Sequence, residues 1–150
     1  MSEAEWSIFL DASVLFAGCH SVLGGSGLVI DAAVVGSLNP WVSHLVVAEA
    51  LRAIRLKSSS DALRRLHEFM ACPGLRLVGI PTPKEVRRYL PLIAAKDCHV
   101  LASAVTSGAK CLLTLDRKHF CTRRLREADL GLTILTPGDF LRLWRDSEKE

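Results

Sequence analysis

Four carboxylates stand where apolar segments of this 150-residue chain begin, end or are interrupted. Asp11 and Asp116 each directly follow an apolar run, Glu49 lies inside one, and Asp97 opens a segment striped with apolar residues. Carboxylates that share a site repel one another, and desolvation raises their pKa further, so the site must bind a cation, take up protons or admit water. If the four side chains meet, they form an anionic pocket suited to Mg²⁺ or Mn²⁺, which take oxygen ligands.

A divalent ion in that pocket would support hydrolysis of a phosphodiester. A bound metal lowers the pKa of a water molecule, orients it and neutralises charge on a phosphoryl oxygen. Two hydroxyl side chains accompany the acids, because Ser13 lies two residues after Asp11 and Thr114 lies two residues before Asp116. Thr114 and Asp116 are expected to face the same side, because residues two apart in a strand do so. We take Ser13 and Thr114 as supporting residues, while a capping Ser13 and a packed Thr114 stay open.

Each acid also has a simpler explanation. Asp11 and Asp97 can be helix N-caps, and Asp116 can be a turn residue. Glu49 can pair with Arg52, three residues along the same helix. These explanations compete one acid at a time, whereas a shared site accounts for all four together. We therefore keep all four as candidate catalytic and metal-binding residues.

Short apolar strands that alternate with helices must position these acids. Continuous apolar strands separated by helices indicate a parallel sheet covered on both faces. The carboxyl ends of its strands meet at one edge, where open parallel sheets bind ligands, and Asp11 and Asp116 belong to that edge. The expected strands are 7–10, 41–44, 75–79, 111–115 and 132–135, and the expected helices start near Ser13 and Arg123 or span 31–37, 45–57, 61–71, 83–90, 97–107 and 136–144.

The helical periodicity also orients two of the acids. Asp97 shares a helix face with apolar residues three, four and seven positions later, and Glu49 shares a side with Ala53 and Leu56. Neither acid is therefore expected to point simply into solvent. The glycine-rich stretch 24–27 is expected to be a surface loop. The remaining aspartates of note are expected to start helices and are left out of the site: Asp31, Asp61 and Asp139.

Length and composition indicate one domain with a packed core. The chain is 49% hydrophobic and 23% charged, and 150 residues is the size of an ordinary domain. No apolar run reaches the ~18–20 residues that span a bilayer, and the first residues lack the basic flank of a signal peptide. The five cysteines form no CxxC pair, which favours free thiols in a reducing compartment. We expect a cytoplasmic protein with no membrane contact.

The cations are clustered, although the net charge is only +3. Such clusters near a phosphate-cutting site would attract a polyanion, while solvated helix faces are the simpler interpretation. His119 could touch a substrate phosphate or be an ordinary packed or exposed histidine. The spacing of the set Cys98-His99, His119 and Cys121 matches no common zinc module. The clusters are Arg64-Arg65, Arg87-Arg88, Arg117-Lys118 and Arg123-Arg124-x-Arg126.

Three segments resemble motifs of the PIN-domain ribonucleases, a family that includes VapC-type toxins of toxin–antitoxin pairs. They are Phe9-Leu10-Asp11-Ala12-Ser13-Val14-Leu15, Lys96-Asp97-Cys98-His99-Val100-Leu101-Ala102-Ser103-Ala104 and Leu113-Thr114-Leu115-Asp116-Arg117-Lys118-His119-Phe120.

The resemblance implies a three-layer α/β/α sandwich with a central parallel sheet. It implies one PIN-like nuclease domain over residues 1–150, with metal-dependent cleavage of RNA. The family's acidic positions map onto Asp11, Glu49, Asp97 and Asp116, and its frequent polar positions onto Ser13 and Thr114. Some relatives have another acid shortly after the last aspartate, where this chain has Lys118, which argues against a tightly held second metal.

We therefore expect a Mg²⁺- or Mn²⁺-dependent endoribonuclease. Asp11, Asp97 and Asp116 would hold the ion, and Glu49 would orient or deprotonate the attacking water. The expected partners are RNA, a second copy of the chain and, in a toxin setting, an antitoxin protein. Two alternatives stay open: a non-catalytic RNA- or protein-binding module with the same fold, and another Mg²⁺-dependent phosphoryl-transfer protein such as a phosphatase or phosphoreceiver domain.

Overall fold

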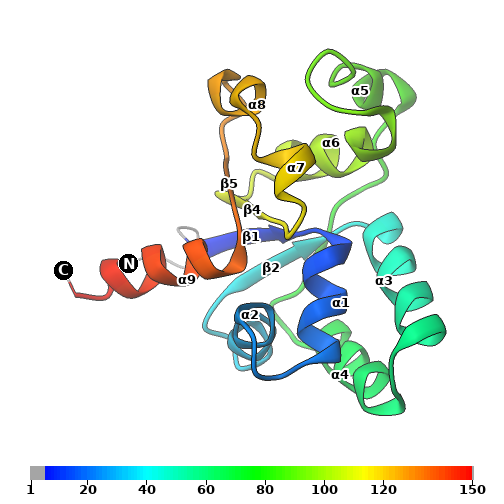
Figure 1. Ribbon diagram of the computed structural model, residues 1–150, viewed down its shortest axis with the longest axis vertical. Helices are drawn as coiled ribbons and strands as arrows, with labels where there is room; N and C mark the ends of the chain where they lie inside the picture. Colours follow the sequence, from blue (N-terminus) through cyan, green and yellow to red (C-terminus); the bar gives the residue numbers. More distant parts are fainter. Residues whose placement is uncertain (1–5, 150) are drawn as a thin grey trace.

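The computed structural model describes residues 6–149, in which five strands form one parallel sheet. The strand order is β3-β2-β1-β4-β5, so the first strand lies at the centre (Figure 1). All the strands pair in parallel, and β1 is bonded to β2 on one side and to β4 on the other. The strands are β1 (Ser7–Leu10), β2 (Asn39–Val42), β3 (Arg76–Leu77), β4 (Cys111–Leu113) and β5 (Thr133–Leu135).

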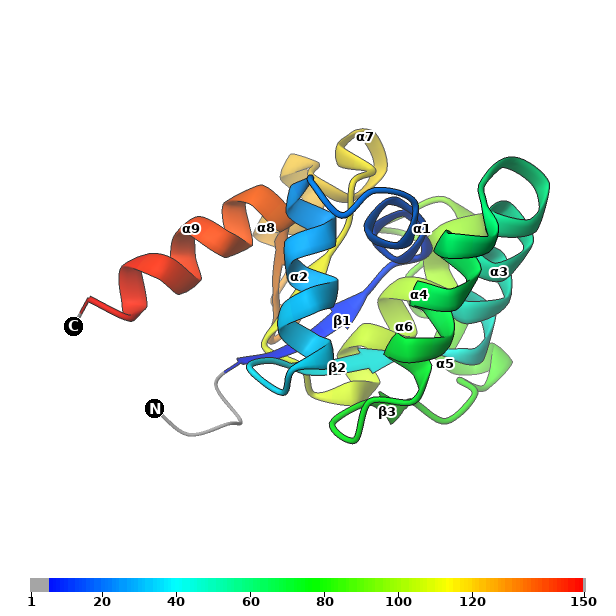
Figure 2. The same cartoon turned by 90° about the horizontal axis from the view of Figure 1, so that it is seen from below.

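Helices cover both faces of the sheet, which confirms the expected three-layer α/β/α sandwich. One layer holds α1 to α4 and the other holds α5 to α8, and the two views agree on this division (Figures 1 and 2). The last helix, α9, packs against α2 beside the sheet. The helices are α1 (Ala12–His20), α2 (Gly25–Val34), α3 (His44–Lys57), α4 (Ser60–Met70), α5 (Pro83–Arg87), α6 (Cys98–Ser107), α7 (Arg117–Phe120), α8 (Arg123–Glu127) and α9 (Pro137–Ser147), with a 3₁₀ turn, η2 (Ala95–Asp97), before α6.

The central strands are buried on both faces, as their continuous apolar sequences predicted. Ile8, Phe9 and Leu10 have no exposed surface, and Leu112 and Leu113 of the neighbouring strand are buried to the same degree. Burying a large apolar side chain contributes about 1.5–3 kcal/mol, so these two strands anchor the sheet. The acids that follow them are thereby attached to fully buried strands at the centre of the sheet.

The second helix corrects two expectations from the sequence. The glycine-rich stretch 24–27 is not a surface loop, because Gly24 is the N-cap of α2 and the helix begins at Gly25. A side chain at Gly27 would meet the carbonyl oxygens of Ser21 and Val22 at 2.6 and 2.7 Å. Glycine is therefore needed for the close approach of the α1–α2 turn, and its usual meaning as a helix breaker misled the prediction.

The early start of α2 places Asp31 in the helix interior instead of at its beginning. Its carboxylate lies 3.2 Å from the guanidinium of Arg65, which also donates two hydrogen bonds to the carbonyl of Gly18. This contact joins α2, α4 and α1 within one layer. Asp31 therefore helps to hold α2 against α4 through its ion pair with Arg65.

The strand expected at 41–44 also lies two residues earlier, at Asn39–Val42. Ser43 leaves the strand and caps α3, because its side-chain oxygen accepts a hydrogen bond from the backbone of Val46. A serine N-cap of this kind contributes about 1 kcal/mol to the helix. This cap fixes where Glu49 stands in α3.

All five cysteines lie in the described residues, and all five are free thiols. Burial raises the pKa of Cys19 and of Cys111 to about 11, so both behave as small apolar side chains. The structure thus confirms the expectation that the chain has no disulfide framework.

Among residues 6–149, no single helix is long and apolar enough to cross a membrane; α1 and α2 would qualify only as a pair, with a bend of 91° between them.

Candidate metal centre

The carboxyl ends of β1 and β4 bring two of the predicted acids to one edge of the sheet. The backbone N–H of Asp11 donates to the carbonyl of Leu113 at 3.0 Å, which carries the pairing of the two strands one residue further. Thr114 continues the pairing toward β5 by donating to the carbonyl of Leu135 at 3.0 Å. Asp11 and the segment that leads to Asp116 therefore stand side by side where the two strands end, as expected.

The carboxylate of Asp11 is buried and held by three donors. Its Oδ1 accepts from the backbone of Ala12 at 2.7 Å, and its Oδ2 accepts from the hydroxyls of Thr114 at 2.8 Å and Ser13 at 3.1 Å. Hydrogen bonds to an ionised acceptor are stronger than neutral ones. Ser13 and Thr114 therefore support the acid, and Asp11 also caps α1, so its structural role exists alongside any chemistry.

The same two hydroxyls connect Asp11 to the segment beyond β4. The backbone N–H of Leu115 donates to Ser13 Oγ, and the backbone N–H of Asp116 donates to Thr114 Oγ1, both at 3.1 Å. Each hydroxyl thus donates to one acid and accepts from the chain beside the other. This relay fixes Asp116 with respect to Asp11 through hydrogen bonds on both sides.

Asp116 is the N-cap of α7, where its Oδ1 accepts from the backbone of His119 at 3.2 Å. The imidazole of the same histidine turns back onto the carboxylate, with Nδ1 3.0 Å from Oδ1 and 2.8 Å from Oδ2. Both side chains are about one-third exposed. His119 therefore belongs to the site, a role that the sequence had offered only as one option among others.

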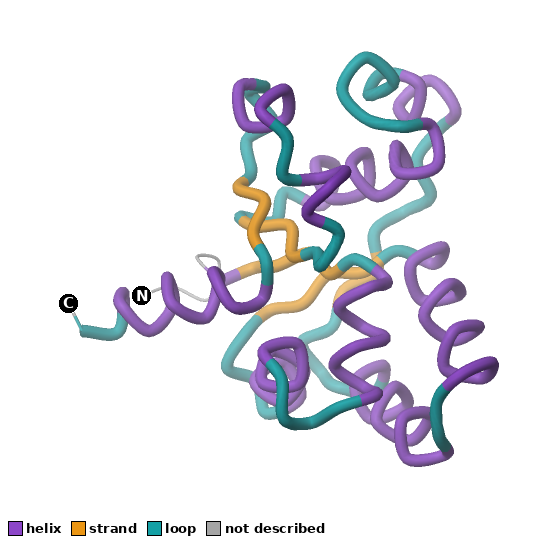
Figure 3. The backbone as a smooth tube through the Cα atoms, viewed as in Figure 1, coloured by secondary structure: helices purple, strands orange, loops and turns teal. Residues whose placement is uncertain are grey.

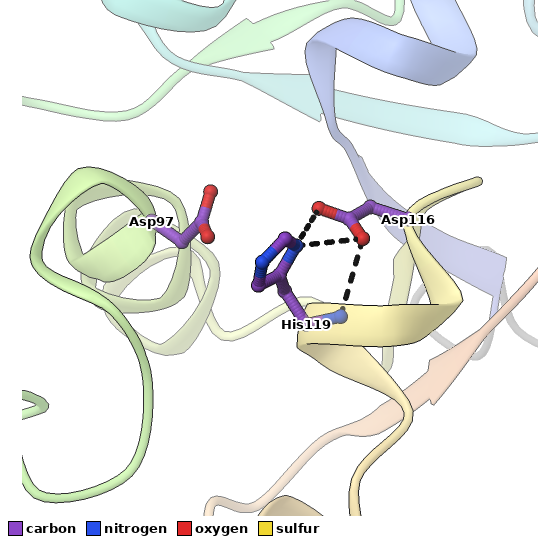
Figure 4. Close-up of side chains that lie close together, drawn as sticks. All are labelled: Asp97, Asp116 and His119. Atoms are coloured by element: carbon purple, nitrogen blue, oxygen red, sulfur yellow. Dashed lines mark hydrogen bonds and ion pairs between the residues drawn. The ribbon is translucent and has the colours of Figure 1, made fainter.

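Asp97 approaches Asp116 and His119 from the start of α6 (Figure 4). It occupies the N-cap position, yet its side chain makes no capping hydrogen bond to the helix within the described chain. Its Oδ2 atom is buried and has no hydrogen-bond partner among residues 6–149. Because a buried polar atom without a partner is costly, this oxygen is suited to receive an ion or another donor.

Burial is the largest cause that raises the pKa of Asp97. The charges of Asp116 and Asp11 raise it further, while Lys96 and His119 oppose the shift. The three aspartates are therefore close enough to repel one another, as the sequence predicted. A cation among them would remove this repulsion and favour the ionised form of Asp97.

One ligand atom each from Asp97, Asp116 and His119 lies within 4.8 Å of the others. Two carboxylates and an imidazole are a suitable donor set for a divalent cation, and the unpartnered oxygen of Asp97 fits that use. Figure 4 shows the imidazole ring between the two carboxylates. Asp11 adjoins this group through Thr114 and its own charge and is not one of its three members.

Glu49 stands apart from this group and is paired with a second histidine. Its Oε1 lies 3.3 Å from Nε2 of His99, which follows Asp97 by two residues in α6. The side chain of Glu49 is 56% exposed and Leu56 is 74% exposed, which corrects the expectation that they share a buried side of α3. The buried face of α3 is formed by Val46, Ala50 and Ile54.

Sequence reasoning missed His99 as a site residue and considered His119 only as a contact to a substrate phosphate. His119 follows Asp116 by three residues, a spacing that places two side chains on the same side of a helical turn, and this signal was available. The pair of Glu49 with His99 joins α3 to α6. A contact between such distant segments cannot be predicted from the spacing of residues within one helix. The expected pair of Glu49 with Arg52 is not among the ion pairs of the described chain.

Comparison with other proteins supports the architecture alone. No protein-family model matches this chain, and no curated protein sequence matches it either. Among solved structures, the chain is similar to the crystal structure of PAE2754 from Pyrobaculum aerophilum, with 21% sequence identity and a TM-score of 0.59. The similarity covers 93% of this chain and 90% of that one. It shows that the chain shares an α/β/α fold across nearly its whole length.

Proposed function

We propose that this chain is a metal-dependent endoribonuclease with a PIN-like domain. The observation that carries the proposal is the group formed by Asp97, Asp116 and His119, whose ligand atoms lie within 4.8 Å of one another beside the buried carboxylate of Asp11. This group lies at the carboxyl edge of a parallel sheet, where such folds bind ligands. The resemblance of the surrounding segments to PIN-domain ribonucleases supplies the choice of RNA as substrate.

Each acid has a distinct part in the proposed reaction. Asp97 and Asp116 hold the ion together with His119, and Asp11 fixes their surroundings through Ser13 and Thr114. A bound Mg²⁺ or Mn²⁺ supplies a water of lowered pKa and neutralises charge on the phosphoryl oxygen. The carboxylates of Asp97 and Asp116 suit Mg²⁺ as well as Mn²⁺. The imidazole of His119 favours Mn²⁺, which accepts nitrogen ligands more readily.

Glu49 is proposed to orient or deprotonate the attacking water. To do so, its carboxylate must leave His99, whose Nε2 lies 3.3 Å from Oε1. The side chain of His99 is only 17% exposed, whereas that of Glu49 is 56% exposed, so Glu49 is the partner that would move when substrate binds. General base catalysis by a positioned carboxylate typically contributes about 10²–10⁴-fold.

The cations around the site support a polyanionic substrate. Arg117 and Lys118 lie in α7 directly after Asp116, and both are exposed. Lys96 lies beside Asp97 and interacts with its charge. Such cations attract a phosphate backbone and make its binding sensitive to salt.

The expected partners remain part of the proposal. A second copy of the chain and, in a toxin setting, an antitoxin protein would bind in addition to RNA. A cytoplasmic location accords with the free thiols of the five cysteines. A small DNA-binding protein encoded beside this chain would support the toxin setting.

The test is cleavage of a labelled single-stranded RNA by the purified chain in Mn²⁺ or Mg²⁺. We expect cleavage that EDTA abolishes and that the Asp11→Asn variant reduces by at least about 100-fold. The variant keeps an oxygen acceptor for Ala12 but loses the acceptor of the Ser13 and Thr114 hydroxyls, so we expect a folded chain with a lower unfolding temperature, checked by circular dichroism. Asp146→Asn, an exposed carboxylate on α9, is the matched control. Unchanged cleavage by Asp11→Asn in a clean preparation would refute the assignment.

One observation favours the non-catalytic alternative. Both oxygens of Asp116 are hydrogen-bonded to His119, and Glu49 is paired with His99, so two acids already have cationic or donor partners. In a non-catalytic binding module, these pairs would stay intact, because no metal would compete for the carboxylates. Titration with Mn²⁺ separates the alternatives, because a module of this kind would neither bind the ion nor cut RNA.

A further inference from the structure

A groove of about 370 Å³ begins at the candidate metal centre and has two chemically different walls. One wall is apolar and consists of Leu90 together with residues 92–94. The other carries His119, Lys118, Thr122 and Arg124 of the α7–α8 region. His119 is thus shared between the metal group and the groove.

The apolar wall is fixed before anything binds to it. The carbonyl of Tyr89, a buried residue, accepts from the backbones of Leu92 at 2.9 Å and Ile93 at 3.1 Å. The thiol of Cys98 in α6 lies 3.7 Å from the carbonyl of Ile93 and 3.5 Å from that of Ala94. These contacts attach the loop to the protein core, yet Leu90 still has 48% of its surface exposed.

A hydrogen bond ties the cationic wall to the loop that carries the apolar wall. Arg124 Nη1 donates to the carbonyl of Pro91 at 3.1 Å, which joins α8 to the loop after α5. A guanidinium has five N–H donors, so this bond leaves others for an anion. The ammonium group of Lys118, an exposed residue, adds a second positive charge on the same wall. Figure 1 shows α5 and α8 projecting on the same side of the sheet, with α6 and α7 between them.

We infer that this groove binds one nucleotide of the RNA next to the bond that is cut. Its phosphate lies against Lys118 and Arg124, and its base packs on Leu90 and residues 92–94. The volume is near the lower end of the range for small-ligand pockets, about 300–1,000 Å³, which suits one nucleotide and not a folded RNA element. The inference rests on the proposed function, because that function supplies the RNA.

The test is binding of a fluorescent single-stranded RNA, measured by anisotropy at several salt concentrations. The Asp11→Asn variant is the parent chain, so that the RNA stays intact in the presence of Mn²⁺. Adding Lys118→Ala should weaken binding about threefold to tenfold and reduce the slope of log K against log salt by about 0.7, the value for one phosphate contact with a single strand. Adding Leu90→Ser should weaken binding by a similar factor and leave the slope unchanged, because it removes apolar contact alone.

Each variant has a matched control elsewhere on the surface. Arg123→Ala removes one charge from α8 at a residue that pairs with Glu127 and does not line the groove. Leu143→Ser changes a leucine of α9 with 45% of its surface exposed, close to the value for Leu90. We expect both controls to bind RNA within about twofold of the parent chain, since single surface changes seldom exceed ±0.5 kcal/mol.

A second measurement locates the base. RNA that contains 4-thiouridine is irradiated on the Asp11→Asn chain, and the cross-linked peptides are identified by mass spectrometry. We expect cross-links in the peptides that contain residues 90–94 and 118–124. Cross-links confined to other peptides would overturn the inference.

The outcomes separate this inference from the proposed function. If the wild type cleaves RNA but Lys118→Ala and Leu90→Ser bind it like their controls, the groove assignment is wrong and the nuclease stands. That result would leave the groove to a protein partner. If the wild type never cleaves RNA with Mg²⁺ or Mn²⁺, yet RNA cross-links in the groove, the nuclease is wrong, and the groove binds a nucleotide as part of a non-catalytic RNA-binding module. If the chain binds no RNA, both are wrong.

Discussion

His119 Nδ1 lies 2.8 Å from Oδ2 of Asp116 and 3.0 Å from its Oδ1, so one imidazole nitrogen contacts both carboxylate oxygens. An ionised carboxylate can only accept hydrogen bonds, so Nδ1 carries the hydrogen. In the neutral ring, Nε2 then has a free lone pair. Histidines that bind metals usually donate their other N–H to a carboxylate or carbonyl in this way. The contact with Asp116 therefore leaves Nε2 of His119 available for the ion that the three residues are proposed to hold.

This arrangement predicts which metal the site prefers. Because an imidazole nitrogen suits Mn²⁺ better than Mg²⁺, His119→Ala should lower the affinity for Mn²⁺ by about 10–100-fold and the affinity for Mg²⁺ by less. The two affinities can be measured by isothermal titration calorimetry on both proteins. His99→Ala is the control, since that histidine is paired with Glu49 and stands outside the group of three. An equal loss for both metals would contradict the preference for Mn²⁺, and no loss for either metal would contradict a ligand role for His119.

The raised pKa of Asp97 predicts how the metal-free protein responds to pH. Burial is its main cause, so the folded chain holds the proton of Asp97 more tightly than the unfolded chain does. Between the unfolded and folded pKa values, the folded state binds more protons, and stability falls as pH rises. The penalty is fully present above the folded pKa and absent below the unfolded value of about 3.9.

Asp97→Asn should therefore raise the unfolding temperature of the metal-free chain at pH 7, by about 1–3 °C for a domain of this size. The gain should disappear near pH 3.5. Differential scanning calorimetry in EDTA measures both, and Asp146→Asn on α9 is the control. If Asp97→Asn destabilises the metal-free chain at pH 7, the ionised carboxylate has a stabilising partner in the folded chain, and burial does not penalise it as predicted.

The close approach at the start of α2 predicts a difference between two glycines of one helix. Gly27→Ala would place a methyl group 2.6 Å from the carbonyl oxygen of Ser21, so the turn must move, at a cost of about 1–3 kcal/mol. Gly25→Ala meets Gly138 at an ordinary 3.5 Å and should be neutral or stabilising, because alanine suits a helix better than glycine. Urea unfolding measures both changes, and similar values for the two variants would contradict this packing.

The layers of the fold and the edge that carries the site could be predicted from the sequence, because both follow from apolar runs. Ile8 to Leu10 and Cys111 to Leu113 are continuously apolar and form the buried centre of the sheet. The acids after them stand at the same edge because parallel strands end on the same side. Figure 3 shows how the loops after these strands meet there.

The sequence could not predict features that depend on contacts between distant segments. The need for glycine at position 27 is explained by the carbonyls of Ser21 and Val22, which become its neighbours only when α1 and α2 pack. The partner of Glu49 is His99, fifty residues later in the chain and in another layer. Local propensity treats Gly-Gly-Ser-Gly as a loop and a glutamate as a partner for the nearest arginine, and tertiary packing overrides both.

The central claim is that Asp97, Asp116 and His119 hold a divalent cation. Electron paramagnetic resonance of Mn²⁺ tests it without requiring any activity, because the signal of the free ion falls as the ion binds. We predict one Mn²⁺ per chain for the wild type and the Asp146→Asn control, with a loss of affinity of at least tenfold in Asp116→Asn. An undiminished signal of free Mn²⁺ at millimolar concentrations of folded wild-type protein would contradict the account.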